Sequence, residues 1–283
     1  MTDAAEYRRE SRARWARTAA GWEAAADAMR RTTMPVSTWM VEAIQPQPGH
    51  TVLELAAGPG DTGFLAAELI EPGGTLISSD FVPEMLSIAQ RRAETLGIRN
   101  VRFRQIDAET TIDLEAASID GVLCRWGYML MTDAGTALHE TRRVLKPGRR
   151  LALAAWTGPE DNLWSALPMR LLVERDLTEP PDPDAPGQFT WAKEGLIAEH
   201  LEAAGFVEYE VDAVPFTLRF PSLEDWWSTQ RDVSMGFNTV VSGLDQATTE
   251  ELKAALRAAA KRFTTDDDSI EIPARTWVAV ATA

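Results

Sequence analysis

Three glycines and one carboxylate have the spacing of a nucleotide-binding site. Gly58, Gly60 and Gly63 follow a short apolar run in the pattern G-x-G-x-x-G, and Asp80 stands twenty residues after Gly60. Glycine lets the backbone approach a ligand closely, and the start of a helix offers free N–H groups. A carboxylate at the end of the next strand can accept hydrogen bonds from both hydroxyls of a ribose. The pattern therefore predicts a site for a ligand that contains adenosine.

The sequence around these residues alternates short apolar runs with amphipathic segments, which is typical of βαβ units. Five strands are expected near residues 51–55, 74–79, 101–106, 119–124 and 150–156. Helices are expected from the glycine turn to about Ile70, from Pro83 to Gly97, and over residues 134–145. Ligands bind beyond the carboxyl ends of parallel strands, so the glycine turn and Asp80 should meet there.

The regular alternation is interrupted after residue 156. The proline-rich segment Glu179–Gly187 is expected to be a loop. It should be followed by a helix over 193–204, a strand over 207–214, two helices that start at capping boxes (Ser222 with Asp225, Thr248 with Glu251), and a last strand over about 270–281. These insertions predict a helical cap beside the sheet.

Large apolar residues mark one face of an expected N-terminal helix. Trp15, Ala19, Trp22, Ala26 and Met29 recur at steps of four and three residues. Such a face must be covered by something. Two interpretations stay open: a helix packed on the domain, or a lid over a ligand.

Composition narrows the classes of partner. The 283 residues carry 28 Lys and Arg against 43 Asp and Glu, a formal net charge of −15, which disfavours nucleic acid as a partner. A single cysteine excludes an internal disulfide and a cysteine-cluster zinc site, and no metal site is expected. The N-terminus lacks signal-peptide features and no apolar run reaches membrane-spanning length. We therefore expect a cytoplasmic protein that does not insert into membranes; its oligomeric state stays open.

Several motifs together resemble one enzyme family. Val52–Gly60 is similar to the first motif of class I S-adenosylmethionine-dependent methyltransferases, which place an acidic residue in the strand before the glycine turn. Further matches are Ser79–Phe81 with Met85 and Leu86, Asp107–Glu109, and Arg143–Gly148. The set covers roughly residues 45 to 156 and looks most like the small-molecule methyltransferases of ubiquinone/menaquinone biosynthesis. Arg149 departs from the family, which usually has a second glycine there.

This resemblance implies the fold and the division of the chain. The expected fold is a doubly wound, Rossmann-like α/β sheet of seven mostly parallel strands, with an antiparallel last strand. Residues 1–45 would form an N-terminal helical lid and residues 46–156 the cofactor-binding core. Residues 157–283 would supply strands six and seven, with cap insertions at about 157–190 and 218–268.

The resemblance also implies which residues hold the cofactor, S-adenosyl-L-methionine. Glu54 and the backbone of Ala56, Gly58 and Gly60 would hold the methionine part, Asp80 the ribose, and Phe81 the face of the adenine. Asp107 and the amide of Ala108 would bind the edge of the adenine, and Cys124 and Arg125 complete the expected set. Leu123 precedes Cys124 where a cysteine nucleophile would follow a proline, so Cys124 is interpreted as a wall residue.

Large apolar groups outside the sheet favour an apolar or aromatic small molecule as the methyl acceptor. The residues expected to line its pocket are Trp126, Tyr128, Met129, Trp15, Trp226 and Phe237, and Trp22 could also close one side. Tyr128 is the candidate for a polar contact with the nucleophile; no other catalytic residue is expected. A sulfonium already activates its methyl group, so alignment for direct in-line displacement can supply most of the catalysis.

Two alternatives use the same glycine turn. One is a nicotinamide-dependent oxidoreductase. The other is a non-catalytic member of the family that binds the cofactor or a partner. His50, His139 and His200 are interpreted as structural or solvated and not as catalytic.

Overall fold

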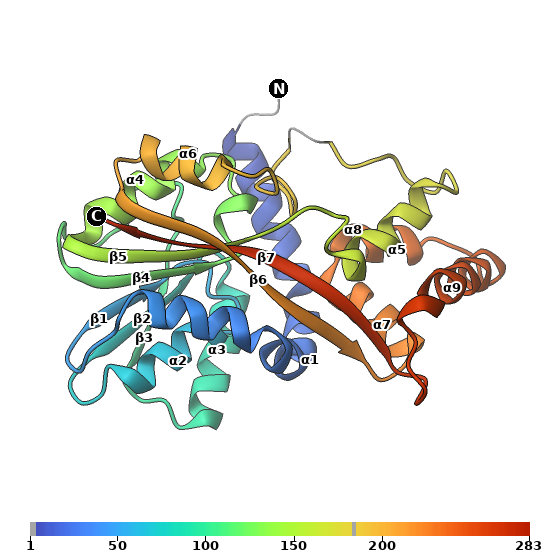
Figure 1. The fold of residues 1–283 in the computed structure, drawn as a ribbon, viewed down its shortest axis with the longest axis horizontal. Helices are drawn as coiled ribbons and strands as arrows, with labels where there is room; N and C mark the ends of the chain where they lie inside the picture. The colour runs from blue at the N-terminus through green and yellow to red at the C-terminus, as the bar shows by residue number, and fades with distance from the viewer. Residues whose placement is uncertain (1–3, 183–184) are drawn as a thin grey trace.

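The computed structural model describes residues 4–182 and 185–283 and contains a seven-stranded sheet in the order β3-β2-β1-β4-β5-β7-β6 (Figure 1). The strands are β1 (Thr51–Glu54), β2 (Thr75–Asp80), β3 (Val101–Gln105), β4 (Ile119–Arg125), β5 (Leu145–Trp156), β6 (Val207–Phe220) and β7 (Ile270–Thr282). Strands β1 to β5 pair in parallel, and β7 pairs antiparallel with both β5 and β6. The predicted doubly wound sheet with an antiparallel last strand is confirmed.

Helices flank the sheet and extend beyond it. They are α1 (Ala4–Ala43), α2 (Asp61–Leu69), α3 (Pro83–Leu96), α4 (Ala134–Val144), α5 (Leu163–Val173), α6 (Leu196–Ala203), α7 (Leu223–Val233), α8 (Met235–Val241) and α9 (Gln246–Ala260). In Figure 1, α4 and α6 lie above the sheet and α2 and α3 below it, while α5, α7, α8 and α9 gather to one side as a cap. Two short 3₁₀ turns, Tyr128–Leu130 and Lys261–Phe263, complete the elements.

Local signals correctly predicted where α3 begins and ends. Pro83 occupies the first turn, where its missing N–H costs nothing, and Gly97 ends the helix in the left-handed region at φ 73°. The capping of α9 was predicted wrongly. Its cap is Asp245 and not Thr248, because the Asp245 carboxylate, three residues earlier, accepts the Thr248 N–H at 2.7 Å.

The sixth strand is longer than predicted. It continues to Phe220, and its last residues pair with the start of β7 from Arg275 back to Ile270. Phe216, Leu218 and Phe220 are buried on one face, while the residues between them are exposed. This β6–β7 ribbon runs from the sheet to the cap (Figure 1).

Helix α1 connects the sheet and its flanking helices with the cap. It is continuous over 40 residues despite Pro35, and it contacts α2 and α3 beside the sheet as well as α7 in the cap. Ala19, Ala26 and Met29 of the predicted stripe are buried. Within the proline-rich loop, positions 183 and 184 lie outside the described residues. None of the described helices combines the length and apolar character that crossing a membrane would require.

Candidate active site

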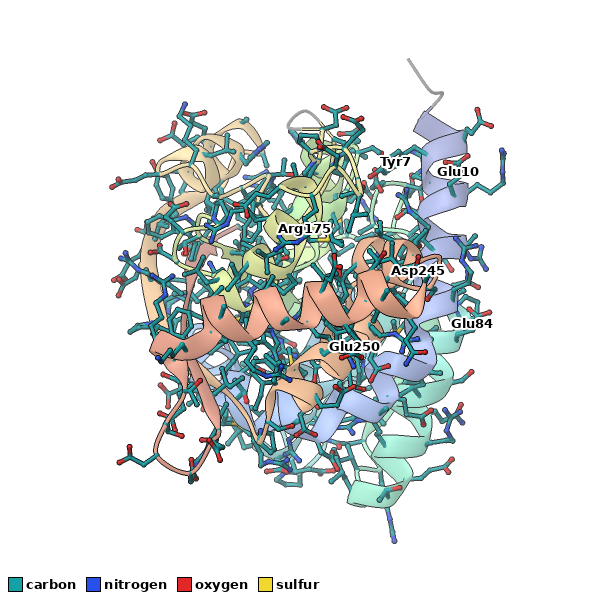
Figure 2. All side chains as sticks on the ribbon, turned by 90° about the vertical axis from the view of Figure 1, so that its right-hand side faces the viewer. Tyr7, Glu10, Glu84, Arg175, Asp245 and Glu250 are labelled. Carbon is teal, nitrogen blue, oxygen red and sulfur yellow. The ribbon has the colours of Figure 1, made fainter. Side chains whose placement is uncertain are left out.

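A cavity of about 360 Å³ lies beyond the carboxyl ends of β1, β2 and β4. The glycine turn, the end of β2 and the start of the loop after β3 form one end of it, and side chains from α1, β5, α5 and α7 form the other. We call these the cofactor end and the acceptor end, after the roles that the sequence predicts for them. Tyr7 at the start of α1 also lines the cavity and donates to the Pro186 carbonyl at 3.2 Å, which ties α1 to the loop before α6 (Figures 1 and 2).

The turn after β1 leaves room for a ligand. Ala56 and Gly58 both line the cavity with left-handed backbones, at φ 51° and 53°. A Cβ added to Gly58 would meet no protein atom within 4 Å, so it would fill open space beside the cavity. The strained conformation of Ala56 is the kind of feature that concentrates at binding sites.

The other two glycines serve packing. A Cβ on Gly60 would lie 2.5 Å from the Phe64 ring, and one on Gly63 would lie 2.3 Å from a carboxylate oxygen of Glu54. Gly60 is not among the lining residues, which corrects its expected contact with the cofactor. Of the three motif glycines, Gly58 alone borders the cavity.

Glu54, at the end of β1, is buried and contributes to the cavity wall. One carboxylate oxygen accepts the Gly63 N–H at 2.8 Å, and the other accepts the Ser78 hydroxyl at 3.4 Å. Burial raises the pKa of Glu54 to about 8, because removing the carboxylate from water disfavours its charged form. The hydrogen bond from the Gly63 N–H to Glu54 also holds the first turn of α2 in place.

Asp80 closes β2 and faces the cavity with little solvent exposure. Its two oxygens accept the N–H groups of Gly58 and Val82, each at 2.9 Å. Burial raises the pKa of Asp80 to about 6. The N–H of Phe81 also interacts with this carboxylate. Because a carboxylate has about four lone-pair sites, capacity remains to accept a hydrogen bond from a ribose.

Three more predicted residues lie at the cofactor end, namely Phe81, Asp107 and Ala108. Asp107 accepts the Glu109 N–H at 3.0 Å and lies 3.9 Å from the Arg8 guanidinium of α1. The open space at Gly58 and the free lone pairs of Asp80 fit a ligand that presents an adenosine group.

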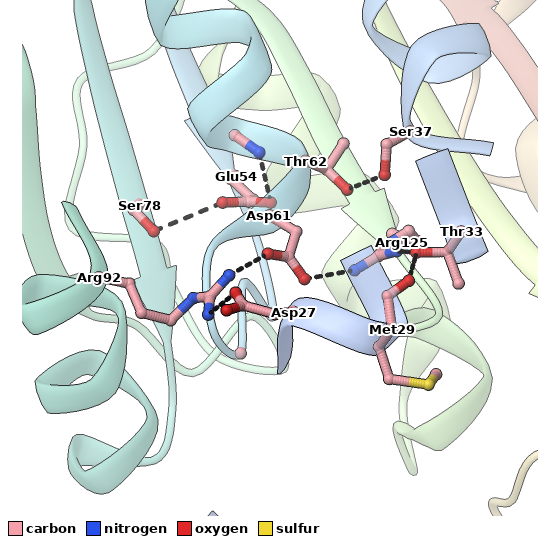
Figure 3. A network of polar contacts seen from close by, with 12 residues as sticks. Asp27, Met29, Thr33, Ser37, Glu54, Asp61, Thr62, Ser78, Arg92 and Arg125 are labelled. Carbon is pink, nitrogen blue, oxygen red and sulfur yellow. Dashed lines mark hydrogen bonds and ion pairs between the residues drawn. The ribbon is translucent and has the colours of Figure 1, made fainter. Parts of the chain in front are cut away.

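A buried ion-pair network fixes the cofactor end against α1 (Figure 3). Asp61, at the start of α2, lies 2.8 Å from Arg92 and 3.6 Å from Arg125. Arg125 also donates to the Thr33 hydroxyl of α1, and burial lowers its pKa, although the two nearby carboxylates oppose this. Arg125 lines the cavity at the end of β4, as expected.

Tryptophans dominate the acceptor end. Trp126 and Trp156 stack with ring centroids 4.3 Å apart, and Trp164 tilts against Trp156 at 5.4 Å. On the α1 side, the ring centroids of Trp15 and Trp22 lie 6.2 Å apart, and both rings belong to the cluster around Val82 and Met85, so they lie where the two ends meet. All five line the cavity together with Met129. Such walls exclude water and suit a flat, apolar ligand.

The comparisons with known proteins agree with this geometry. Residues 46–172 match the family described as a methyltransferase domain. Phosphoethanolamine N-methyltransferase 2 of Haemonchus contortus, solved with S-adenosyl-L-methionine, shares the fold at a TM-score of 0.51 and 18% identity, over 87% of this chain and 52% of that chain. The chain contains a methyltransferase domain. The structures of that Haemonchus contortus protein hold S-adenosylhomocysteine in one case and S-adenosyl-L-methionine in the other.

Two curated relatives show how much of the chain is similar in sequence to named methyltransferases. Nocamycin O-methyltransferase of Saccharothrix syringae is 28% identical over 199 residues, 67% of this chain and 71% of that protein. Demethylmenaquinone methyltransferase of Thermus thermophilus is 37% identical over 108 residues, 38% of this chain and 48% of that protein. The chain therefore spans about half the length of the second relative.

The structure places four predicted residues of the methyltransferase away from the cavity. Tyr128 is buried, its hydroxyl lies 2.7 Å from that of Thr141, and its ring stacks on Trp191, so it cannot contact the acceptor as expected. Trp226 and Phe237 are wholly buried inside the cap, and Cys124 is wholly buried behind the wall. Burial also raises the pKa of the Cys124 thiol to about 12, which opposes a nucleophilic role.

Other lining residues were not predicted. Trp156 and Trp164 follow one another across the β5–α5 connection, and Gln230 lies on the buried face of α7. Trp156 could have been found from its place at the carboxyl end of β5. Gln230 could have been found as a polar residue in the otherwise apolar stripe of Trp226 and Val233. Among residues 4–182 and 185–283, no His, Cys, Asp and Glu cluster has the makings of a metal site.

Proposed function

We propose that the methyltransferase transfers a methyl group from S-adenosylmethionine to an apolar or aromatic small molecule by direct in-line displacement. The observation that carries this proposal is the continuity of one cavity from Gly58 and Asp80 to the stacked pair Trp126 and Trp156. Both reactants would thus share one enclosed space. Proximity and orientation of this kind can supply about 7–11 kcal/mol of a barrier.

Each end of the cavity would have its own task. When bound, the cofactor supplies a methyl group that its sulfonium already activates. Asp80 would orient the ribose, and the backbone at Ala56 and Gly58 would lie along the methionine part. The tryptophans would hold the acceptor flat and keep water out. Since alignment is the main requirement, the side chains need not include a strong general base.

Charge and composition support two further parts of the proposal. A net charge of −15 favours a small-molecule partner over nucleic acid, because phosphate backbones are repelled. A single cysteine fits a cytoplasmic location, where thiols stay reduced.

The test is calorimetric titration of the ligand-free protein, checked by mass spectrometry, with S-adenosylhomocysteine. We expect micromolar or tighter binding, on the order of −8 kcal/mol. A parallel titration with NADH and NADPH tests the oxidoreductase alternative. Binding of a nicotinamide cofactor without binding of S-adenosylhomocysteine would refute the proposal. Methyl transfer to any apolar acceptor would exclude a non-catalytic role.

A further inference from the structure

Three residues at the acceptor end contain buried polar atoms that have no hydrogen-bond partner among the described residues. They are both amide atoms of Gln230 and the indole nitrogens of Trp22 and Trp164. All three side chains line the same cavity. Buried polar groups in native proteins almost always have partners, so each exception needs an explanation. Three exceptions around one cavity indicate a ligand that supplies the missing partners.

Gln230 is the central residue of this group. It lies on the buried face of α7 and has no solvent exposure. An unpaired buried amide destabilises a protein, and a methionine or leucine would fill the same space without that cost. Packing alone therefore does not explain a glutamine at this position.

The surrounding contacts join the segments that carry the three residues. The Trp226 indole of α7 donates to the Trp164 carbonyl at 2.7 Å, which fixes α7 against α5. On the other side, α1 and α7 approach so closely that a Cβ on Gly21 would lie 2.3 Å from the Asp232 carbonyl oxygen. Gly21 precedes Trp22 directly, and Asp232 lies two residues after Gln230. Segments far apart in sequence thus meet beside the cavity that all three side chains line.

The unpaired atoms require a particular chemical partner. Gln230 offers one acceptor oxygen and an NH₂ donor, and each indole offers one N–H donor. An ether or ketone can satisfy only the donors, and an ammonium group only the acceptor. A hydroxyl donates one hydrogen bond and accepts two, so it matches both. Because all three side chains are neutral, the group suits an uncharged hydroxyl.

We propose that Gln230, with Trp22 and Trp164, forms a hydroxyl-recognition site that selects a flat, apolar acceptor bearing a phenolic or enolic hydroxyl. This inference rests on the proposed function, since it names the acceptor class of the same cavity. The unpaired atoms are covered in the free protein. An acceptor therefore reaches them through a shift of side chains at the boundary between α1 and α7.

The first experiment uses the full chain saturated with S-adenosylhomocysteine and three probes of similar shape. These are 2-naphthol, 2-methoxynaphthalene and 2-methylnaphthalene, measured by equilibrium dialysis. We expect 2-naphthol to bind about tenfold more tightly than the methoxy compound, because only the hydroxyl pairs with the Gln230 oxygen. Equal binding of the two, or no binding of 2-naphthol, would overturn the inference.

Substitution of Gln230 tests whether this residue causes the preference for 2-naphthol over the methoxy compound. Gln230→Met keeps the size of the side chain, and we expect the two affinities to come within about twofold of each other. Gln90→Met makes the same change on the exposed face of α3 and should leave the preference intact. A preference that survives in Gln230→Met would contradict the assignment. Should that variant fold poorly, Gln230→Leu removes the same acceptor oxygen and should abolish the preference in the same way.

Two controls separate the inference from the proposed function. The affinity for S-adenosylhomocysteine should be unchanged in Gln230→Met. If the wild-type protein did not bind S-adenosylhomocysteine at all, the proposed function itself would be refuted. The unfolding temperature of ligand-free Gln230→Met should equal or exceed that of the wild type, because an unpaired amide is removed. A clear decrease would reveal a protein partner for the amide and overturn the inference.

Discussion

The two ends of the cavity are built in different ways. At the cofactor end, most lining residues lie between Glu54 and Arg125 in one continuous part of the chain, with Arg8 of α1 beside Asp107, and backbone turns at Ala56 and Gly58 shape the wall. At the acceptor end, the walls are side chains from α1, β5, α5 and α7, from Trp15 to Gln230. A cofactor site is thus encoded locally in sequence, whereas an acceptor site depends on how distant segments meet.

The ends also differ in charge. Glu54, Asp80 and Asp107 face the cofactor end, while tryptophans and a neutral amide form the acceptor end. Carboxylates suit hydroxyl groups and the positive charge of a sulfonium ligand. An apolar wall suits a neutral ring. Substitutions at the two ends should accordingly affect different ligands, and the following predictions test that separation.

The largest effect is expected where the two ends are joined. Asp61→Ala leaves Arg92 and Arg125 without their shared buried partner and should lower the free energy of unfolding by about 3–5 kcal/mol. Urea denaturation measures this change. Asp27→Ala removes an exposed partner of the same Arg92 and should cost less than about 1 kcal/mol. Equal costs would mean that the buried network does not hold the two ends together.

Glu54→Gln should stabilise the free protein. The pKa of Glu54 is raised in the folded state from 4.5 to about 8, so ionisation costs stability as the pH rises through this window. The amide avoids that cost and still accepts the Gly63 N–H. We expect a gain of about 2–4 kcal/mol at pH 8.5 that disappears near pH 4.5. Glu68→Gln, on the exposed face of α2, is the matched control; a gain independent of pH would contradict the explanation.

Asp80→Asn should weaken the cofactor end alone. Loss of charged hydrogen bonds to a ribose predicts a 10- to 100-fold decrease in S-adenosylhomocysteine affinity at pH 7.5, measured by calorimetry. The pKa of about 6 adds a pH dependence: wild-type affinity should fall as the pH drops below 6 and the carboxylate is protonated, and the variant should show a flatter profile. Unchanged affinity in folded Asp80→Asn would show that the ribose lies elsewhere.

Tyr128→Phe should have the smallest effect. The variant loses one hydrogen bond to Thr141, which predicts a decrease in stability of about 1 kcal/mol. Binding of 2-naphthol should stay within twofold of the wild type, because Tyr128 faces away from the cavity. Trp126→Phe, within the stacked wall, should change that binding several-fold. A large effect of Tyr128→Phe on binding would contradict this placement, because it would mean that the acceptor reaches the Tyr128 side chain.

Prediction from sequence succeeded where the signals are local. The boundaries of α3 follow from Pro83 and Gly97, each of which acts through its own backbone. It failed where two local signals compete or where a distant strand decides. The sequence predicted Thr248 as the cap of α9, whereas Asp245 caps the helix. The length of β6 depends on its pairing with β7.

For the site, the sequence by itself determined the centre of the cofactor end, although it also added Gly60 and Cys124, which do not line the cavity. The glycine turn and Asp80 are placed by strands that must be parallel neighbours, and short-range sterics fix their conformations. Only the tertiary structure decided the acceptor end. Tyr128 and Trp126 lie two residues apart, yet Tyr128 packs inward against Thr141 and Trp191, whereas Trp126, with a left-handed backbone at φ 60°, lines the cavity. Which side chains meet across α1, α5 and α7 depends on packing between segments some two hundred residues apart, and no local pattern encodes it.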